Sequence, residues 1–227
     1  MYSIFYVLVF LTSFFIGSLP ISYWYGKIFK DIDLLQIGTK SVGSANLSVF
    51  AGKKASFFVA VLDFGLKGII PLSVLGLLGF EEWVQIISGL LIVCGHNWSL
   101  FIKFKGGRGI LTSLGIILTI GLWVELLLIC ILAGLVGRGL IYKDSGFWTF
   151  IGFFLLVVFV LIFNPDKHFV VFSSILILML IVKRLIANTR LLPGANIYRT
   201  LAYRLIFDRD VRSRSNWISG QSRNSNT

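Results

Sequence analysis

The sequence predicts an all-α polytopic membrane protein with seven transmembrane helices, and three observations support this fold class. Apolar residues make up 56% of the 227 residues and charged residues only 14%, with a mean hydropathy of +0.89, so the chain has too little polar surface to cover a soluble globule. Apolar runs of about 20 residues, long enough for a ~30 Å hydrocarbon core, recur along the chain. The net charge of +11 comes from cations between these runs and in the tail. Because no separate basic domain carries them, the charge indicates membrane topology and no nucleic-acid partner.

The N-terminal half contributes three expected spans. The first covers residues 3–25 and contains Gly17-Ser18-Leu19-Pro20, where the proline should kink or end the helix. It lacks a basic start and a small-residue cleavage site, so we expect a retained span and not a signal peptide. The polar stretch 26–54 is too long for a simple connection and should be a structured loop. The second and third spans are expected at residues 55–80 and 83–100.

The stretch 109–137 fits one long helix or two short ones, and loop charge decides between them. Loops at 26–54, 102–108 and 138–143 and the tail from 183 onward hold every Lys and Arg except Lys67 and Lys167. All of them can lie on the cytoplasmic side, as the positive-inside rule requires, only if the stretch is split, which we expect near residues 121–125. Spans six and seven follow at 146–163 and 169–182. The N-terminus is then outside and the C-terminus cytoplasmic.

The chain should divide into three parts. Residues 1–190 form the membrane domain, residues 191–212 a basic amphipathic segment that lies on anionic lipid headgroups, and residues 213–227 a disordered tail. Cys94 and Cys130 lie inside apolar runs and are expected to be buried thiols. Without a Cys/His cluster, we expect no metal or other cofactor.

One polar stretch, residues 95–112, joins two spans and reads GHNWSLFIKFKGGRGILT. Its glycines can turn backbone N–H groups toward an anion, the following helix offers its positive end, and the cations supply full charge. A phosphate site is one interpretation. The other is that Lys103, Lys105 and Arg108 only mark a cytoplasmic loop. The spacing is not that of a nucleotide-binding P-loop.

Two ionisable residues lie inside the second span. Asp63 and Lys67 are four residues apart, so they can pair on one helix face and offset the cost of charge at membrane depth. Lys67 is therefore either the partner of Asp63 or a second cation for phosphate.

Three separated blocks match the pattern of one protein family. The best block follows GHxxPxFxxFKGGKGVAT at Gly95, His96, Phe101, Phe104, Lys105, Gly106, Gly107, Gly109 and Thr112. The second block is Lys67-Gly68-Ile69-Ile70-Pro71, and the first contains Gly17-Ser18-Leu19-Pro20, Asp33, Gly38, Gly43, Asn46, Gly52, Lys53 and Lys54. In this, the chain resembles the acyl-phosphate-dependent glycerol-3-phosphate acyltransferases of bacteria, the PlsY family of small seven-span inner-membrane enzymes.

Several positions depart from the family pattern. Leu35 and Val49 stand where the family has arginines, Thr39-Lys40-Ser41 replaces Ser-Gly-Asn, and Ser44-Ala45 replaces Ala-Thr. Arg108 stands for a lysine, and Arg184 for a histidine. Ala187 stands for an asparagine, unless a one-residue slip brings Asn188 to that position. Lys40 and Arg184 could restore lost phosphate contacts or alter the acceptor.

The resemblance implies transfer of a fatty acyl group from acyl phosphate to glycerol 3-phosphate, giving lysophosphatidic acid at the cytoplasmic face of the bacterial inner membrane. The expected partners are these two substrates and membrane lipids, and the protein is expected to be a monomer. The candidate catalytic residues are His96, Ser41 and Asn46. The candidates for phosphate binding are Gly43, Ser44, Lys67, Lys105, Gly106, Gly107, Arg108 and Gly109.

Two alternatives to this function stay open. The first is a paralogue that keeps the anion pocket but binds phosphorylated lipid precursors without turnover, because several family residues are replaced. The second is a small transporter with Asp63 and Lys67 in its pathway, which the lack of detectable repeats disfavours. His96 is either a general base or a histidine hydrogen-bonded at the membrane interface.

Overall fold

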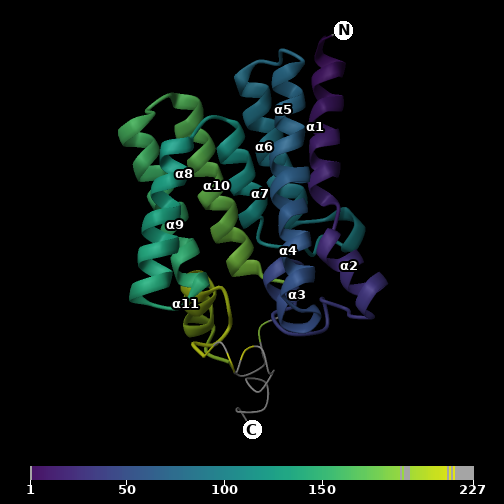
Figure 1. Ribbon diagram of the computed structural model, residues 1–227, viewed down its shortest axis with the longest axis vertical. Coiled ribbons are helices and arrows are strands. Elements are labelled where there is room, and N and C mark those ends of the chain that lie inside the picture. Colours follow the sequence, from purple (N-terminus) through teal and green to yellow (C-terminus); the bar gives the residue numbers. More distant parts are fainter. Residues whose placement is uncertain (1, 190, 192–194, 214, 216, 218–227) are drawn as a thin grey trace.

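The protein is a bundle of apolar helices that run roughly along one axis (Figure 1). The computed structural model describes residues 2–189, 191, 195–213, 215 and 217. Among these, six stretches are long and apolar enough to cross a membrane: Ile4–Lys30, Lys53–Leu77, Glu82–Ile102, Trp123–Ile141, Ser145–Phe163 and Lys167–Ile186. A shorter apolar helix, Ile110–Thr119, adds to them. These helices support the predicted all-α membrane class, while the count of seven spans and the orientation of the termini stay predictions.

The first two predicted spans are each built from several helical segments. α1 (Tyr2–Ser18) stops before Pro20, as predicted, and α2 (Ile21–Lys30) continues the chain. The structured loop holds α3 (Ser44–Ala51), and α4 (Lys53–Val61) leads through the π-helical η1 (Leu62–Ile69) into α5 (Ile70–Leu77). Asp63 and Lys67 both lie in η1, where the wider helical turn changes the direction of side chains.

The remaining chain supplies the other half of the bundle. It contains α6 (Glu82–Asn97), the 3₁₀ turn η2 (Leu100–Ile102), α7 (Ile110–Thr119), α8 (Trp123–Ile129), the π-helical η3 (Cys130–Ile141), α9 (Ser145–Phe163) and α10 (Lys167–Ile186). The helix break between α7 and α8 falls at residues 120–122, where Gly121 has a φ of +88°. The stretch 109–137 is thus two helices, as the loop charges predicted.

Side chains from α5 to α10 form the main core. Leu72, Ile92, Ile116, Leu156 and Phe172 are fully buried within it. Large apolar side chains also cover the outside of the bundle, with Leu77 and Phe57 at 88% and 73% exposure. An apolar exterior of this extent is stable in lipid and costly in water.

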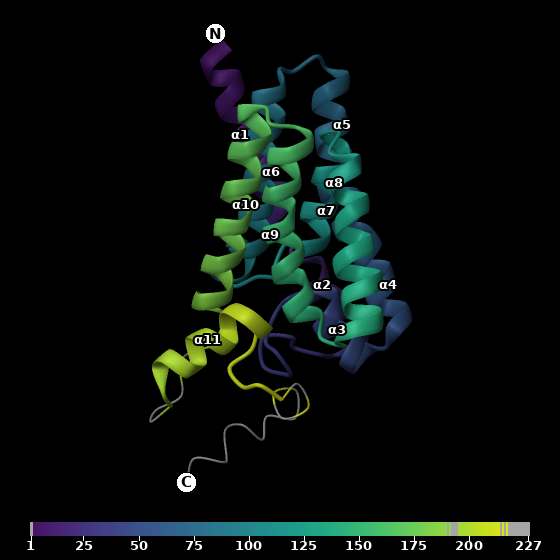
Figure 2. The ribbon, with the colours of Figure 1, turned by 90° about the vertical axis from the view of Figure 1, so that its left-hand side faces the viewer.

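The two ends of the bundle differ. The N-terminus lies at one end, whereas α2, α3, the last helix α11 (Ile197–Phe207) and the described residues after it gather at the other end (Figures 1 and 2). We call this second end the basic end. α11 is a separate helix that contacts α9 and α10.

The predicted segment 191–212 contains α11, but two of its arginines do not face solvent. Arg204 and Arg209 are only 3% and 6% exposed and pair with Asp210 and Asp144. Arg204 of α11 therefore packs on the protein, while Ile197, Tyr198 and Arg199 are exposed. Contact of this segment with lipid headgroups stays a prediction. Most of the predicted disordered tail, 213–227, lies outside the described residues.

Candidate active site

A cavity of about 230 Å³ lies at the basic end of the bundle. Its walls are Thr39, Ser41, Gly43, Ser44, Ala45, Asn46 and Val49 from the first loop and α3; Arg108, Gly109, Ile110 and Leu111 from the start of α7; Ser145, Gly146 and Thr149 from α9; and Asp63, His96, Arg184, Phe207, Asp208, Arg209 and Trp217. The cavity thus joins the first loop, the start of α7 and the end of α10.

The N-terminus of α3 faces this cavity with unused backbone donors. Gly43 precedes the helix in an extended conformation, and no side chain caps its first turn. Gly43, Ser44 and Ala45 all line the cavity. The first N–H groups of a helix have no internal acceptor and carry its positive dipole end, so this edge of the cavity suits an anion.

Asn46 holds the first loop in shape. Its amide nitrogen donates to the carbonyl oxygens of Leu34, Ile37 and Ser41 at 3.4, 3.3 and 3.1 Å, and its oxygen accepts from the backbone N–H of Thr39 at 3.2 Å. Every polar atom of the side chain is therefore engaged with backbone. These contacts indicate a positioning role for Asn46, and its predicted catalytic role stays a prediction; Ser41 also lines the cavity.

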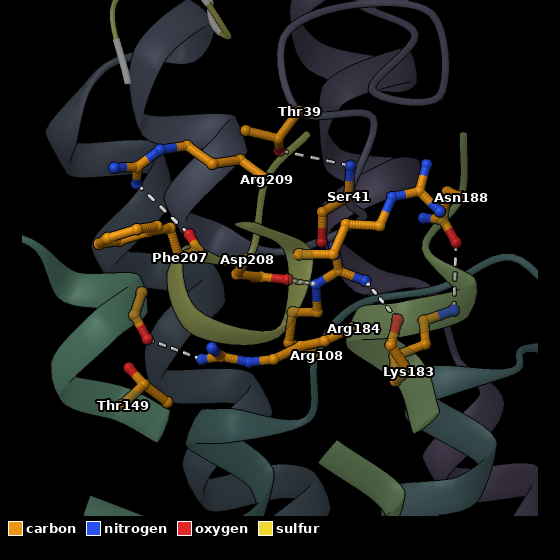
Figure 3. Close-up of polar contacts among 12 residues, drawn as sticks. Thr39, Ser41, Arg108, Thr149, Lys183, Arg184, Asn188, Phe207, Asp208 and Arg209 are labelled. Carbon is orange, nitrogen blue, oxygen red and sulfur yellow. Dashed lines mark hydrogen bonds and ion pairs between the residues drawn. The ribbon is translucent and has the colours of Figure 1, made fainter. Parts of the chain in front are cut away.

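Arg108 lines the cavity but is already paired with a carboxylate. Its Nε lies 2.7 and 2.9 Å from the two carboxylate oxygens of Asp208, and it donates from Nη1 to the carbonyl of Lys183 at 3.0 Å (Figure 3). Its side chain is only 11% exposed. Arg108, a predicted phosphate ligand, therefore lines the cavity while paired with the carboxylate of Asp208.

Arg184 is a second cavity arginine, and it is almost completely buried. It donates to the carbonyls of Leu205, Ile206 and Gly146 at 2.7, 3.3 and 2.8 Å. Its Nε has no hydrogen-bond partner among the described residues. Because this nitrogen is shielded from solvent, a phosphate oxygen could accept from it only after the Arg184 side chain turns toward the cavity.

The loop 187–189 also reaches this region. Asn188 donates to the carbonyls of Lys40 and Gly106, both at 2.8 Å, and accepts from the Lys183 ammonium at 3.1 Å. Ala187, which precedes it, has a φ of +49°. Of the two residues considered for the family asparagine, Asn188 is therefore the one that ties the first loop to the glycine turn.

The glycine turn serves close packing more than anion binding. Gly107 donates its N–H to the His96 carbonyl, and Gly106 accepts from Val42 and Asn188. Neither glycine lines the large cavity, whereas Gly109, with a φ of +68°, does. The prediction that Gly106 and Gly107 cradle phosphate gains no support from this cavity. Both pack against the end of α6.

Gly106→Ala is expected to prevent normal folding of the basic end. A Cβ on Gly106 would lie 2.4 Å from the backbone oxygens of both Asn97 and His96, which cannot move without displacing α6. We expect the unfolding midpoint to fall by several degrees, consistent with an overpacking cost of about 3 kcal/mol. Gly65→Ala is the control, because nothing lies within 4 Å of its added Cβ. Equal thermal stability of the two variants would contradict this packing role.

His96 belongs to a buried polar cluster with Asp63, Lys67 and Thr112. The Lys67 ammonium lies 3.0 Å from Asp63 and 3.3 Å from Nδ1 of His96, and Thr112 lies 3.4 Å from the same nitrogen. Because an ammonium only donates, Nδ1 accepts and the ring proton is on Nε2. The lone pair of His96 thus faces the cluster. This favours the hydrogen-bonded histidine over the general base.

Two predicted phosphate cations lie away from the cavity. Lys67 is 1% exposed and borders only a cavity of about 10 Å³, so its pairing with Asp63 is the interpretation that the structure supports. Lys105 is exposed and lines neither cavity. Among the described residues, its ammonium has no ion-pair partner, which leaves the side chain free to turn.

Sequence analysis missed the acidic residues that fasten the C-terminal segment. Asp208 binds Arg108, and Asp144, which caps α9 by accepting from the N–H of Phe147, binds Arg209. Burial alone would raise the pKa of Asp144, but the hydrogen bonds from Arg209 and Phe147 outweigh it and hold the pKa below its ordinary value. Asp208-Arg209-Asp210, two acids within a basic segment, was the available signal.

Comparison with known proteins places this fold and site in a family. The family model described as glycerol-3-phosphate acyltransferase matches residues 7–194. Glycerol-3-phosphate acyltransferase 4 of Dehalococcoides mccartyi is 36% identical, covering 91% of this chain and 90% of that protein. Glycerol-3-phosphate acyltransferase of Fusobacterium nucleatum is 31% identical, covering 84% and 95%.

A solved structure has the same fold. The crystal structure of PlsY (YgiH), an integral membrane glycerol 3-phosphate acyltransferase in its glycerol 3-phosphate form, superposes with a TM-score of 0.71 at 25% identity, covering 79% of this chain and 88% of that one. Together with the match over residues 7–194, this shows that the chain belongs to the glycerol-3-phosphate acyltransferase family.

Proposed function

We propose that this protein transfers a fatty acyl group from acyl phosphate to the 1-hydroxyl of glycerol 3-phosphate and releases lysophosphatidic acid and inorganic phosphate. One observation carries the proposal most directly. In a chain of this family, one cavity is lined by the uncapped N-terminus of α3 and by the two cations Arg108 and Arg184. Both features suit phosphate, which both substrates carry.

The proposed site lies at the cytoplasmic face of a bacterial inner membrane. Six long apolar helices and the shorter α7 would make seven spans, with the two termini at opposite ends of the bundle. The lysines and arginines of the loops and of α11 gather with the cavity at the basic end. The positive-inside rule supports assigning that end to the cytoplasm.

The size and lining of the cavity suit the polar parts of both substrates. A cavity of about 230 Å³ is smaller than the pockets that enclose whole drug-sized ligands. Its lining includes the apolar side chains of Val49, which is 43% exposed, Ile110 and Leu111. The acyl chain can therefore leave the cavity on this apolar side and remain in lipid.

The reaction needs placement and charge stabilisation more than a protein nucleophile. The glycerol 1-hydroxyl oxygen bonds to the carbonyl carbon as the bond from that carbon to the phosphate oxygen breaks. The departing phosphate takes the hydroxyl proton and leaves as hydrogen phosphate. The α3 N-terminus, Arg108 and Arg184 would hold the phosphates and stabilise the charge that develops, which is catalysis by proximity and electrostatics.

Lys105 remains a proposed phosphate ligand, since its exposed ammonium stands beside the glycine turn. The test is acyl-phosphate-dependent acylation of labelled glycerol 3-phosphate by the purified protein in detergent. We expect lysophosphatidic acid from the wild type and a KM for glycerol 3-phosphate about tenfold higher in Lys105→Ala, as for loss of one charge-assisted hydrogen bond. Lys143→Ala, another exposed lysine that lines neither cavity, is the control.

Each outcome of this assay has a definite meaning. Product from the wild type with an unchanged KM in Lys105→Ala would remove Lys105 from the site and leave the function intact. Absence of product from protein that is folded and binds acyl phosphate would reject the acyltransferase in favour of the non-catalytic paralogue.

A further inference from the structure

The segment after α10 contributes an anion to the cavity from a part of the chain that the family match does not cover. The family match ends at residue 194; Phe207 is the last residue of α11, and Asp208 and Arg209 follow it. All three line the cavity. We call the described residues 195–213 the strap.

Two ion pairs beyond Asp208 hold the strap over the cavity. Arg209 donates to Asp144, and Arg204 to Asp210, with all four side chains at least nine-tenths buried. Arg204 also donates to the carbonyls of Leu185 and Thr189 at 2.9 and 3.0 Å. These contacts fix the backbone on both sides of Asp208 without involving Arg108. The position of the Asp208 carboxylate is thus set by the strap as a whole.

The Asp208 carboxylate occupies the position that an anionic substrate needs on Arg108. Both of its oxygens lie within 2.9 Å of Arg108 Nε, and its side chain remains 20% exposed beside the cavity. Arg184 lies close enough that the charges of Asp208 and Arg108 act on it. A phosphate that binds the Nε edge of Arg108 must therefore replace a carboxylate that is already bound.

Such a replacement discriminates between anions by their charge. A phosphodiester or a carboxylate carries one negative charge, so it gains nothing over Asp208 in the field of Arg108 and Arg184. A phosphomonoester carries about 1.5 to 2 negative charges near neutral pH and has three acceptor oxygens, so it can compete. The membrane around the site presents phosphodiester headgroups at high local concentration, and an unpaired arginine there would bind them.

We propose that Asp208 is a specificity-determining residue, an internal carboxylate that reserves Arg108 for phosphomonoesters and keeps monoanionic phosphodiesters off it. This inference rests on the proposed function, because it takes Arg108 as a ligand of the substrate phosphate. It adds a residue of the strap to the determinants of binding.

The test compares steady-state kinetics of Asp208→Asn with the wild type in phosphatidylcholine micelles and in micelles that contain phosphatidylglycerol. In phosphatidylcholine we expect the KM for glycerol 3-phosphate to fall about fivefold with kcat unchanged, the size of a weak, partly exposed ion pair. Phosphatidylglycerol should inhibit Asp208→Asn and leave the wild type unaffected. A merely structural Asp208 would instead give a higher KM or a lower kcat.

Two further variants make the comparison specific. Asp208→Glu keeps the carboxylate and should retain resistance to phosphatidylglycerol. Asp166→Asn removes an exposed carboxylate at the start of α10, away from the strap and the cavity, and should leave the KM unchanged. An unchanged or higher KM in Asp208→Asn, or the same fall in Asp166→Asn, would overturn the proposal. Arg108→Gln separates this from the proposed function: an unchanged KM in that variant removes Arg108 from the site altogether.

Hydrogen exchange of the wild-type protein provides a measurement that needs no variant. Saturating inorganic phosphate should speed exchange of the amides of residues 205–211, because displaced Asp208 no longer anchors the strap. Unchanged or slower exchange there would count against the displacement of Asp208.

Discussion

Replacing Arg184 by methionine is expected to destabilise the basic end and remove most of the activity. The guanidinium is 1% exposed and joins α10 to the carbonyls of Leu205 and Ile206 on α11 and of Gly146 on α9. Methionine fills similar space but leaves three carbonyls without a donor. The expected loss is about 3 kcal/mol or more in the free energy of unfolding. Because the cavity also loses a cation, kcat/KM should fall about a hundredfold or more.

The measurement pairs thermal unfolding with the acyltransfer assay. Arg199→Met is the matched control, since Arg199 lies on α11 with Arg204 but is exposed. Its Nε lies 3.2 Å from the phenol oxygen of Tyr203. Arg199→Met should change the free energy of unfolding by no more than about 0.5 kcal/mol. Arg184→Lys retains the positive charge but lacks the planar guanidinium, so its activity should lie between the activities of Arg184→Met and Arg199→Met. Wild-type stability and activity in Arg184→Met would show that the three carbonyl contacts contribute nothing.

Much of the fold follows from hydropathy and charge because the bilayer restricts what a chain can do. Each apolar run had to become a helix, since backbone groups in lipid must be paired within the segment. Pro20 ends α1 and the break at residues 120–122 divides α7 from α8, both at positions that the sequence marks with Pro or Gly. Periodicity alone did not reveal the π-helical η1 and η3, which depend on packing against neighbouring helices.

The candidate site was predicted less well than the fold, because ion pairs between distant residues leave no local pattern. Arg108 and Asp208 are 100 positions apart, and Asp144 and Arg209 are 65 apart. The sequence therefore does not show that its cations have partners, whereas Arg204 and Arg209 are buried in ion pairs with Asp210 and Asp144. Gly43, Ser44, Arg108 and Gly109 do line the cavity, since a loop before a helix directs its first N–H groups to one place. Glycines at 106 and 107 can serve either anion binding or close packing of the backbone, and the structure shows the close packing.

Lys67→Met is expected to be among the most damaging single changes in the chain. Lys67 and Asp63 are 1% and 3% exposed and lie 3.0 Å apart within the second membrane-spanning stretch. Removal of the ammonium leaves the carboxylate buried without a counter-charge, at a cost of about 3 to 5 kcal/mol. We expect a large fall in the yield and thermal stability of the folded protein in detergent.

The double variant Asp63→Asn/Lys67→Met decides what the lysine is for. It removes both charges and should recover most of the lost stability, because the cost lies in the unpaired charge and not in the missing pair. If Lys67 only neutralises Asp63 and donates to His96, both the stability and the KM for glycerol 3-phosphate should recover in the double variant. The KM should then lie within about threefold of the wild-type value, a smaller change than loss of one charge-assisted hydrogen bond would cause. If stability recovers but the KM stays about tenfold above the wild-type value, Lys67 would instead be a ligand of the substrate phosphate. The geometry favours the first result, since His96 and Asp63 line the large cavity and Lys67 does not.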